Sequence, residues 1–264
     1  STTMNIMCGV LKQTSGNVFI KGIDLRKDPV KAKMHVGFLP QQPPLHTDLT
    51  VEEYLVHCAF LRRLSGKEVD HAVREVMGKC GIAHFRRRLV RNLSGGYQQR
   101  VGIAQAIIHD PLFVILDEPT NGLDPNQITE VRHLIKGIAE DRAVLISTHI
   151  LPEVQAVCDY IMMIEHGQKV FEGTINAFNT YMSPSALMTI MHNAPTTEEL
   201  LKIEGIVRVE RLTKTRIRLH FKGDNAIVGR VVKQAVENQW HLREISLEKE
   251  SLDKVFAKLS GKEV

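Results

Sequence analysis

The hydrophobic and polar positions of the first two thirds of the chain alternate between strand-like and helix-like patterns. Residues 112–116 and 143–146 are continuous apolar runs, which suit strands buried on both faces of a parallel sheet. Residues 35–39 form a third short apolar run, and residues 126–140 carry apolar side chains at helical spacing. Strands that alternate with helices in this way predict an α/β domain.

Capping signals support several of the predicted helices. Thr50 and Glu53 form the Thr-x-x-Glu pattern of a capping box, which predicts that a helix begins after Thr50. Ser94 is a suitable N-cap for a helix that runs to about His109. Residues 1–12 carry apolar side chains at helical spacing, and we expect them to form a helix.

The pattern changes after about residue 180. Residues 181–204 are rich in Ser, Pro, Thr, Asn and Met, and they are predicted to be a linker with some helix. Residues 205–264 predict a small α+β domain, near the lower size limit for independent folding. Its predicted elements are strand 206–212, strand 216–221, helix 225–238, strand 241–247 and helix 252–259.

Composition excludes several classes of protein. A net charge of +4, from 34 basic and 30 acidic residues, is too small an excess to argue for nucleic-acid binding. The four cysteines lie far apart without a CxxC pair, which argues against a disulfide framework or a zinc site and for a reducing compartment. No apolar run approaches the ~18 residues that span a bilayer. We therefore expect a cytoplasmic protein that reaches a membrane only through a partner.

Two adjacent acids, Asp117 and Glu118, follow the apolar run 112–116. Buried acids are costly without partners, and ligands of open α/β sheets bind at the carboxyl ends of the strands. Asp117 is suited to hold hydrated Mg²⁺, and Glu118, on the other side of the strand, is suited to orient or deprotonate a water. Taken alone, the pair could equally be a surface turn after a strand.

The segment Ser94-Gly95-Gly96 opens a helix, and it offers backbone N–H groups without side chains in the way. Such a helix N-terminus suits phosphate binding. Taken alone, it could equally be an N-cap followed by flexible glycines. The apolar run and the paired acids that follow at this spacing favour the functional interpretation.

Four motifs, in this order, resemble those of the ATPase domain of ABC transporters. LSGGY with QQRVGIAQAI is similar to the signature motif, VILDEPTNGLDP to Walker B with the D-loop, and ISTH to the H-loop. The resemblance implies a P-loop NTPase-like ABC ATPase domain over 1–180, a core parallel sheet flanked by helices with a helical subdomain at about 48–108. The linker 181–204 and the α+β domain 205–264 would follow. The sequences of these motifs most resemble those of the ABC-2, exporter-type group.

The resemblance also implies roles around the subunit's own ATP. Asp117 would ligate Mg²⁺, and Glu118 would act on the attacking water. His149, which could otherwise be a structural histidine, would be the switch residue that contacts the γ-phosphate. Gln41, in Phe-Leu-Pro-Gln, matches the Q-loop glutamine that touches Mg²⁺ and the water, although the adjacent Gln42 leaves a second register open.

Other residues would act across a dimer. By resemblance, Ser94, Gly95 and Gly96 contact the ATP of a second subunit. Tyr97 stands where many family members have glutamine, but the serine and glycines carry the phosphate contact. Asp124 would be the D-loop aspartate that links the two sites, although it could be no more than a turn acid.

The phosphate-binding pattern GxxxxGK[ST] does not occur in the chain. Ser1-Thr2-Thr3, followed by an apolar helix, is similar to the end of that motif. Ser1 would then ligate Mg²⁺, and Thr2 would lie beside the nucleotide. We therefore expect the chain to be a fragment of a longer protein, and to hydrolyse no ATP without the upstream loop.

The function implied by the resemblance is that of an ATP-binding and ATP-hydrolysing subunit of an ABC transporter. ATP and Mg²⁺ would be its cofactors, and its partners would be a separate membrane permease and a second ATPase subunit. Dimer closure on ATP would drive transport, with export favoured, at the inner face of the membrane. One alternative is a non-transport ABC ATPase. Another is a non-catalytic module, which would have no need of Glu118 and His149.

Overall fold

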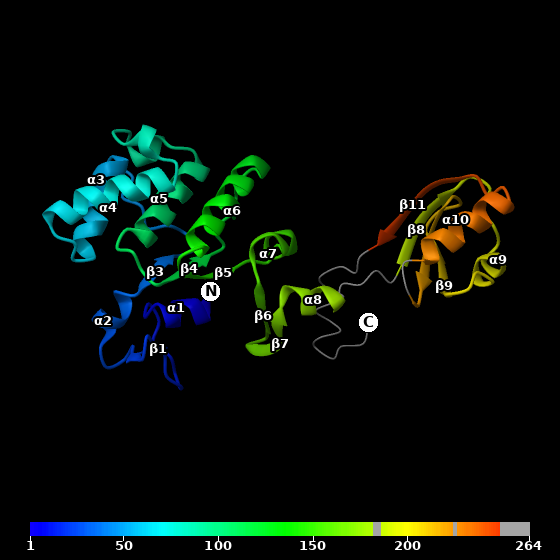
Figure 1. Cartoon of the computed structure of the whole chain (residues 1–264), viewed down its shortest axis with the longest axis horizontal. Helices are drawn as coiled ribbons and strands as arrows, with labels where there is room; N and C mark the ends of the chain where they lie inside the picture. Colours follow the sequence, from blue (N-terminus) through cyan, green and yellow to red (C-terminus); the bar gives the residue numbers. More distant parts are fainter. Residues whose placement is uncertain (182–185, 224–225, 249–264) are drawn as a thin grey trace. The chain divides into compact units, whose positions relative to one another are not determined.

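The three apolar runs of the first half of the chain pair in one parallel sheet. The computed structural model describes residues 1–181, 186–223 and 226–248, and in it the strands lie in the order β3-β4-β5 (Figure 1). They are β3 (Val36–Leu39), β4 (Phe113–Asp117) and β5 (Ala143–Ser147). Leu116 is in register with Leu39 on one side and Ile146 on the other. The central strand β4 is buried from its second residue onward, as its apolar run predicts.

Helices cover both faces of this sheet. The helices that contact it include α1 (Thr2–Met7), α5 (Gly95–Ile107) and α6 (Pro125–Ala139). Met4 of α1 packs with Ile115 on one face, whereas Val114 and Leu116 belong to the core formed with α5 and α6. Since side chains alternate along a strand, Asp117 points to the same face as Ile115, the face that α1 covers.

The helix α1 is shorter than the predicted 1–12. It ends at Met7, and Gly9 has a φ of 64°, which is the left-handed conformation that glycine adopts after a helix. A Cβ at Gly9 would also meet Cε of Lys33 at 2.7 Å. The apolar spacing beyond Met7 therefore does not continue the helix, and Val10 and Leu11 are exposed.

The remaining elements of the first unit, Ser1–Val157, lie before β3, between β3 and β4, and after β5. They are β1 (Phe19–Ile20), β2 (Ile23–Asp24), α2 (Pro29–Lys33), α3 (Val51–Leu61), α4 (Gly66–Lys79), the 3-10 helices η1 (Ala83–Phe85) and η2 (Val90–Asn92), and α7 (Leu151–Val157). The predicted capping box is confirmed: Thr50 N–H donates to Glu53 Oε2 at 2.8 Å, and Glu53 N–H donates to Thr50 Oγ1 at 3.3 Å.

Helix side chains bond to the carbonyl groups of β3 and of the residues before it. Gln105 Nε2 donates to Phe38 O at 2.8 Å, and His109 Nε2 lies 3.2 Å from Val36 O. Arg62 Nη1 donates to Lys33 O at 3.1 Å. Within the described sheet β3 is an edge strand, so these bonds satisfy acceptors that no neighbouring strand pairs.

The second unit, Cys158–Val264, contains an antiparallel hairpin and a four-stranded antiparallel sheet. Its elements are β6 (Tyr160–Glu165), β7 (Gln168–Thr174), α8 (Ile175–Tyr181), β8 (Ala186–Met191), α9 (Thr197–Leu201), β9 (Ile206–Arg211), β10 (Arg216–Phe221), α10 (Ile227–Glu237) and β11 (Leu242–Glu248). The hairpin β6–β7 falls in the second unit, although the sequence assigned residues up to 180 to the first domain.

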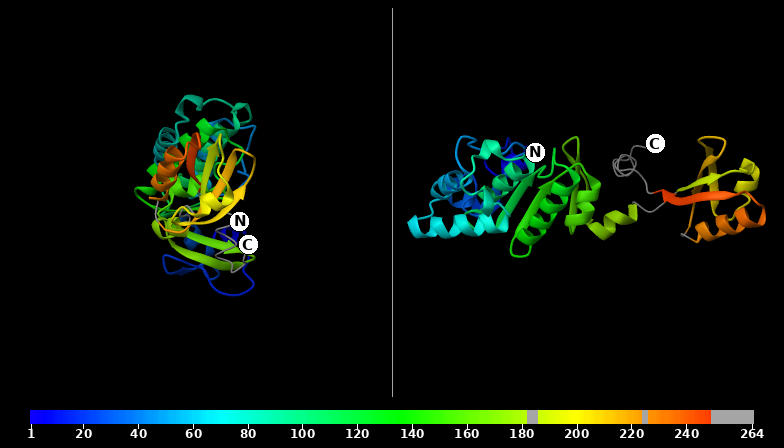
Figure 2. Two further views of the ribbon diagram at one scale, coloured as in Figure 1. Left: turned by 90° about the vertical axis from the view of Figure 1, so that its right-hand side faces the viewer. Right: turned by 90° about the horizontal axis from the view of Figure 1, so that it is seen from above.

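The last six of these elements form a βαββαβ unit. The sheet order is β11-β8-β10-β9, which is the ferredoxin-like arrangement. Leu200 of α9 and Val231 of α10 pack with Leu187 and Leu219 of the sheet, and α10 lies along one face of it (Figure 1, Figure 2). On β10, Arg218 points to the other face, where it pairs with glutamates of β9 and β11.

The predicted linker over 181–204 is therefore wrong for the residues that the structure describes. Residues 186–191 form β8, which lies between β10 and β11, and residues 197–201 form α9. Five of the six residues of β8 are buried, so the strand lacks the polar alternation by which half-buried strands are recognised. The α+β domain thus includes residues before 205. The predicted helix 252–259 lies outside the described residues.

The buried histidine His109 makes the stability of the first unit depend on pH. Burial, followed by the charge of Arg62, lowers the pKa of His109 from 6.5 to about 4. Between pH 6.5 and pH 4, the unfolded chain therefore binds a proton that the folded chain does not. The stability that depends on a neutral His109 is fully present above pH 6.5 and is lost as the pH falls. At pH 5 the loss amounts to about 2 kcal/mol.

We expect His109→Gln to weaken this pH dependence, because glutamine keeps a donor for Val36 O but does not titrate. Urea unfolding at pH 7.5 and pH 5 measures the difference. The exposed His133 of α6 provides the control, and His133→Gln should keep the wild-type dependence. An unchanged pH dependence in His109→Gln would contradict the assignment.

Candidate functional site

Asp117 ends the buried strand β4 with a carboxylate that is almost fully buried. Only 2% of the residue is exposed. Its partner in the β4–β5 ladder is Ser147, whose Oγ donates a hydrogen bond to Asp117 Oδ1. Because Asp117 lies on the face that α1 covers, its carboxylate is presented at the carboxyl edge of the sheet on that face.

Glu118 leaves the strand through an unusual backbone conformation. Its φ is 50°, in the left-handed region that costs a non-glycine residue roughly 1 kcal/mol or more. The N–H of Glu118 lies 3.1 Å from Ser147 O and 3.2 Å from Ser147 Oγ. The hydroxyl of Ser147 therefore contacts both acids, through the side chain of one and the backbone of the other.

His149 meets Glu118 at the carboxyl ends of β4 and β5. His149 Nδ1 lies 3.0 Å from Glu118 Oε1 and 3.2 Å from Oε2. An ionised carboxylate only accepts hydrogen bonds, so Nδ1 is the donor and Nε2 is left for another partner. The hydrogen bond that His149 donates to Glu118, and then the charge of Glu118, raise the pKa of His149. The predicted pair is thus brought together, with 73% of the histidine side chain exposed.

Gln41, Ser1 and Thr2 are exposed residues near the same part of the sheet. Gln41 follows the end of β3 by two residues, on the strand that pairs with β4. Ser1 is the N-cap residue of α1 and Thr2 is its first residue, on the helix that covers the Asp117 face. Within the described residues, no hydrogen bond joins any of these three side chains to Asp117.

Ser94, Gly95 and Gly96 form the N-terminus of α5, as predicted. The Ser94 side chain makes no capping hydrogen bond, so its hydroxyl is free of that role. A Cβ at Gly95 would meet nothing within 4 Å, whereas one at Gly96 would lie 2.5 Å from Cδ of Gln127. Gly95 therefore leaves the first helical turn open, and Gly96 permits the close approach of α6.

Asp124 is the N-cap of α6. Its Oδ1 accepts hydrogen bonds from Asn126 N–H at 3.0 Å and from Gln127 N–H at 2.9 Å. The predicted D-loop aspartate therefore has a structural role within its own chain, where its side chain caps α6. Gln127 touches both this cap and Gly96, so the D-loop and the signature segment are neighbours.

The sequence did not single out two residues that hold the site together. Ser147 bridges both acids, and the buried Glu153 of α7 bonds to Thr120 and Thr148. The only signal for Ser147 was its position two residues before His149, at the end of an apolar run. A cleft of 590 Å³ between α4 and α6, lined by residues that include Cys80 and His133, contains none of the predicted site residues.

Comparison with known proteins gives consistent matches. A family model described as ABC transporter matches residues 1–121. The bacitracin transport ATP-binding protein BcrA of Bacillus licheniformis is 30% identical over 99% of this chain and 84% of its own length. The chain belongs to the ABC transporter family.

Two further matches agree with this assignment. The daunorubicin/doxorubicin resistance ATP-binding protein DrrA of Streptomyces peucetius is 28% identical over 99% of this chain and 80% of its own length. A solved ATP-binding subunit of an ABC transporter matches with a TM-score of 0.60 and 27% identity, over 68% of this chain and 75% of the other. The predicted ABC ATPase fold is confirmed.

This chain is therefore an ATP-binding subunit of an ABC transporter, the kind of subunit that works in a complex with membrane components. Within the described ranges, no helix combines the length and apolarity that a bilayer-spanning segment needs. In the same ranges, no cluster of three His, Cys, Asp or Glu side chains forms a metal site.

The donors at the end of β4 nevertheless suit Mg²⁺. This ion takes one or two carboxylates together with other oxygen ligands and keeps several waters. Asp117 supplies one carboxylate, of which Oδ1 is bonded to Ser147 and Oδ2 remains for a ligand. The Ser1 hydroxyl and the Gln41 amide oxygen are ligands of the same hard type. These residues thus offer oxygen ligands of the kind that Mg²⁺ takes.

The contact between Gly96 and Gln127 predicts a mutational effect on stability. Gly96→Ala should lower the free energy of unfolding by up to about 1 kcal/mol, because the Gln127 side chain must move away from the new Cβ. Gly95→Ala, which meets open space, should be neutral or stabilising by up to ~1 kcal/mol. Urea unfolding measures both, and the double variant Gly96→Ala, Gln127→Ala should lose less than the sum of the single variants. Additive losses would contradict a direct clash.

The Glu118–His149 hydrogen bonds predict a change that NMR can observe. In Glu118→Gln, the pKa of His149 should fall towards its usual value of 6.5, because the charge that raises it is removed. Titration of the imidazole resonances measures this shift, with the exposed His71 of α4 as an internal control. If the titration of His149 does not change, the two side chains are not paired in solution.

Proposed function

We propose that this subunit hydrolyses ATP at the carboxyl ends of β4 and β5. The observation that carries the proposal is the carboxylate of Glu118 within 3.0 Å of His149 Nδ1, beside the buried Asp117. Glu118 accepts a proton of a water while the water oxygen attacks the γ-phosphorus. The bond between the γ-phosphorus and the β,γ-bridging oxygen breaks, so that ADP leaves and inorganic phosphate is released. The doubly protonated form of His149, which its raised pKa favours, has a second N–H at Nε2 that donates to a γ-phosphate oxygen.

In this proposal, Asp117, Ser1 and Gln41 would hold Mg²⁺, and Thr2 would lie beside the nucleotide phosphates. Bound Mg²⁺ would supply charge neutralisation of the phosphate oxygens. The Ser147 hydroxyl orients the Asp117 carboxylate, so the chain presents an oxygen there in a fixed position. The position of α1 on the same sheet face as Asp117 supports the pairing of Ser1 with this carboxylate.

We further infer that two ATPase subunits close on two ATP molecules. The N-terminus of α5 supports this because Ser94 and Gly95 leave N–H groups and a hydroxyl open for a phosphate of the partner's ATP. Gln127 connects Gly96 with the cap formed by Asp124. Movement of the signature segment in one site would therefore reach Asp124, which links it to the other site.

We base the proposed direction of transport, and the proposed location of the subunit, on the descriptions of two relatives. The relatives BcrA and DrrA are described as a bacitracin transport protein and a daunorubicin/doxorubicin resistance protein. Resistance to a drug is consistent with its removal from the cell, so we propose that this subunit drives export through a separate permease. The subunit would then bind the permease at the cytoplasmic face of the membrane.

The proposal predicts the behaviour of Glu118→Gln in the intact protein. Its rate of Mg²⁺-dependent phosphate release should fall by roughly 10²–10⁴-fold, because glutamine cannot take the proton of the water. ATP should still bind and should hold the subunits together as a dimer. Phosphate release and size-exclusion chromatography with ATP measure the two effects.

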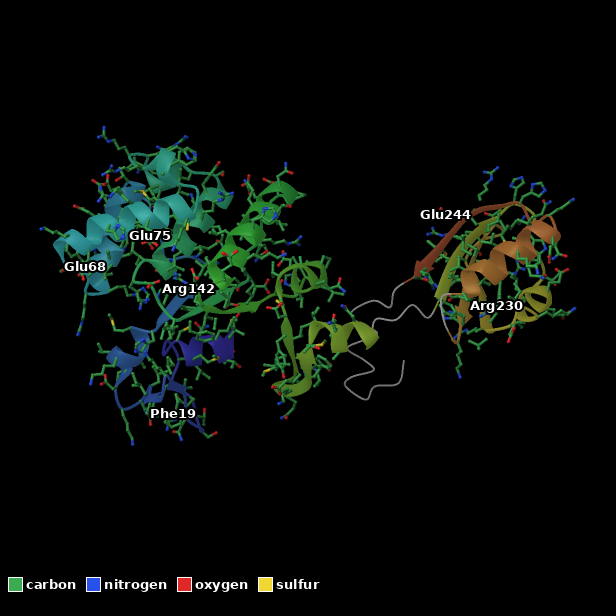
Figure 3. The ribbon with its side chains drawn as sticks, in the orientation of Figure 1. Phe19, Glu68, Glu75, Arg142, Arg230 and Glu244 are labelled. Carbon is green, nitrogen blue, oxygen red and sulfur yellow. The ribbon has the colours of Figure 1, made fainter. Side chains whose placement is uncertain are left out.

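The matched control is Glu75→Gln, which removes an exposed acid of α4 far along the chain from the site (Figure 3). It should leave phosphate release unchanged. Wild-type turnover in Glu118→Gln would remove Glu118 from its proposed role. A wild-type protein that binds ATP without hydrolysing it would favour the non-catalytic alternative.

A further inference from the structure

Glu153 of α7 is a buried acid that the proposed mechanism does not use. Only 2% of the residue is exposed, and a buried carboxylate is costly unless hydrogen bonds satisfy it. Its Oε1 accepts a hydrogen bond from Thr120 Oγ1, and its Oε2 accepts one from Thr148 Oγ1 at 2.9 Å. Each oxygen of the carboxylate is therefore bonded to a different segment of the chain.

Both segments carry residues of the proposed site. Thr120 lies two residues after Glu118, in the segment that leads to Asp124. Thr148 directly precedes His149, and its Oγ1 also accepts the N–H of Ile150 at 3.1 Å. The Thr148 side chain thus bonds both to the backbone of Ile150, on the other side of His149, and to the carboxylate of Glu153.

A third segment approaches the same carboxylate. Arg132 Nη2 of α6 lies 3.9 Å from Glu153 Oε1, and α6 is the helix that Asp124 caps. Glu153 therefore contacts the segment after β4, the segment after β5 and the helix that follows the D-loop. One carboxylate connects parts of the chain that no strand ladder holds together.

This connection matters for His149 because little else fixes the histidine. With 73% of its side chain exposed, the ring is not positioned by packing. Its hydrogen bonds to Glu118 depend on where the backbone at 148–150 places it. A displacement of about 1 Å at a catalytic group can cost 10²-fold in rate. The hydrogen bond between Thr148 and Glu153 should therefore affect the rate of the proposed reaction.

We propose that Glu153 is a positioning residue for ATP hydrolysis, which holds His149 against Glu118 and couples this pair to the segment ending in Asp124. The inference rests on the proposed hydrolytic function for its kinetic consequence. Its structural part, the placement of His149, does not depend on that function.

The variants Glu153→Ala and Glu153→Gln test the proposal in the intact protein. Glu153→Ala should lower kcat by about 10–100-fold, with less than about 3-fold change in KM for ATP, because Glu153 does not touch the nucleotide. Glu153→Gln should recover most of kcat, since its amide can accept a bond from one threonine and donate one to the other. Glu75→Ala, the loss of an exposed acid, should change neither constant.

The titration of His149 by NMR separates positioning from general destabilisation. In Glu153→Ala the pKa of His149 should fall towards the value in Glu118→Gln, because the histidine is no longer held against the carboxylate. Thr148→Val, which leaves Glu153 and Thr120 in place, should shift the pKa in the same direction and lower kcat. It provides the test if Glu153→Ala does not fold.

The outcomes distinguish this proposal from the proposed function. A wild-type protein without turnover contradicts hydrolysis, and the NMR titration then still decides whether Glu153 places His149. Wild-type kcat and an unchanged His149 titration in both Glu153→Ala and Thr148→Val would overturn the positioning role. Equal losses in Glu153→Ala and Glu153→Gln would overturn the hydrogen-bonding mechanism.

Discussion

The pairing of Asp117 with Ser147 at the end of the β4–β5 ladder is the constraint on which the site depends. Ser147 Oγ donates to the Asp117 carboxylate and also accepts from the N–H of Glu118. A one-residue shift between the strands would turn every side chain of β5 to the other face and would remove this hydroxyl from both acids. The register of a buried sheet thus fixes the orientation of the proposed metal ligand and of the proposed base.

That register is in turn set by the layers packed on the sheet. Ile115 belongs to the core with α1, whereas Leu116 belongs to the core with α5 and α6, so neither face tolerates a shift. Gly37 allows α5 to approach β3 closely, since a Cβ there would lie 2.1 Å from Ala106 O. The helix whose N-terminus is the signature segment is therefore fixed against the same sheet that carries Asp117.

The sequence predicted the parts of the molecule that rest on local chemistry. The continuous apolar runs predicted β4 and β5, and the capping box at Thr50 predicted α3. The motifs singled out Asp117, Glu118 and His149 as candidates, and the structure brings Glu118 and His149 within hydrogen-bond distance. It could not predict β8, because a strand buried at nearly every position has no alternation and its Met and Ala residues do not favour strands. Nor could it predict the bond from Ser147 to Asp117 or the bond from Thr120 to Glu153, each of which joins residues 30 or more positions apart through unremarkable side chains.

The buried Glu153 also shows why the effects of site residues should not add. Segments that leave the carboxyl ends of parallel strands have no ladder to hold them, and here side-chain bonds to one carboxylate replace it. Each threonine that is removed leaves an acceptor of a buried charge unpaired, which costs more than the net gain of the bond it made. The segments after β4 and β5 are therefore stable in this arrangement only together. Hydrogen bonds to Glu153 connect Thr148, which precedes His149, with Thr120 in the segment that leads to Asp124, so these two parts of the site are coupled.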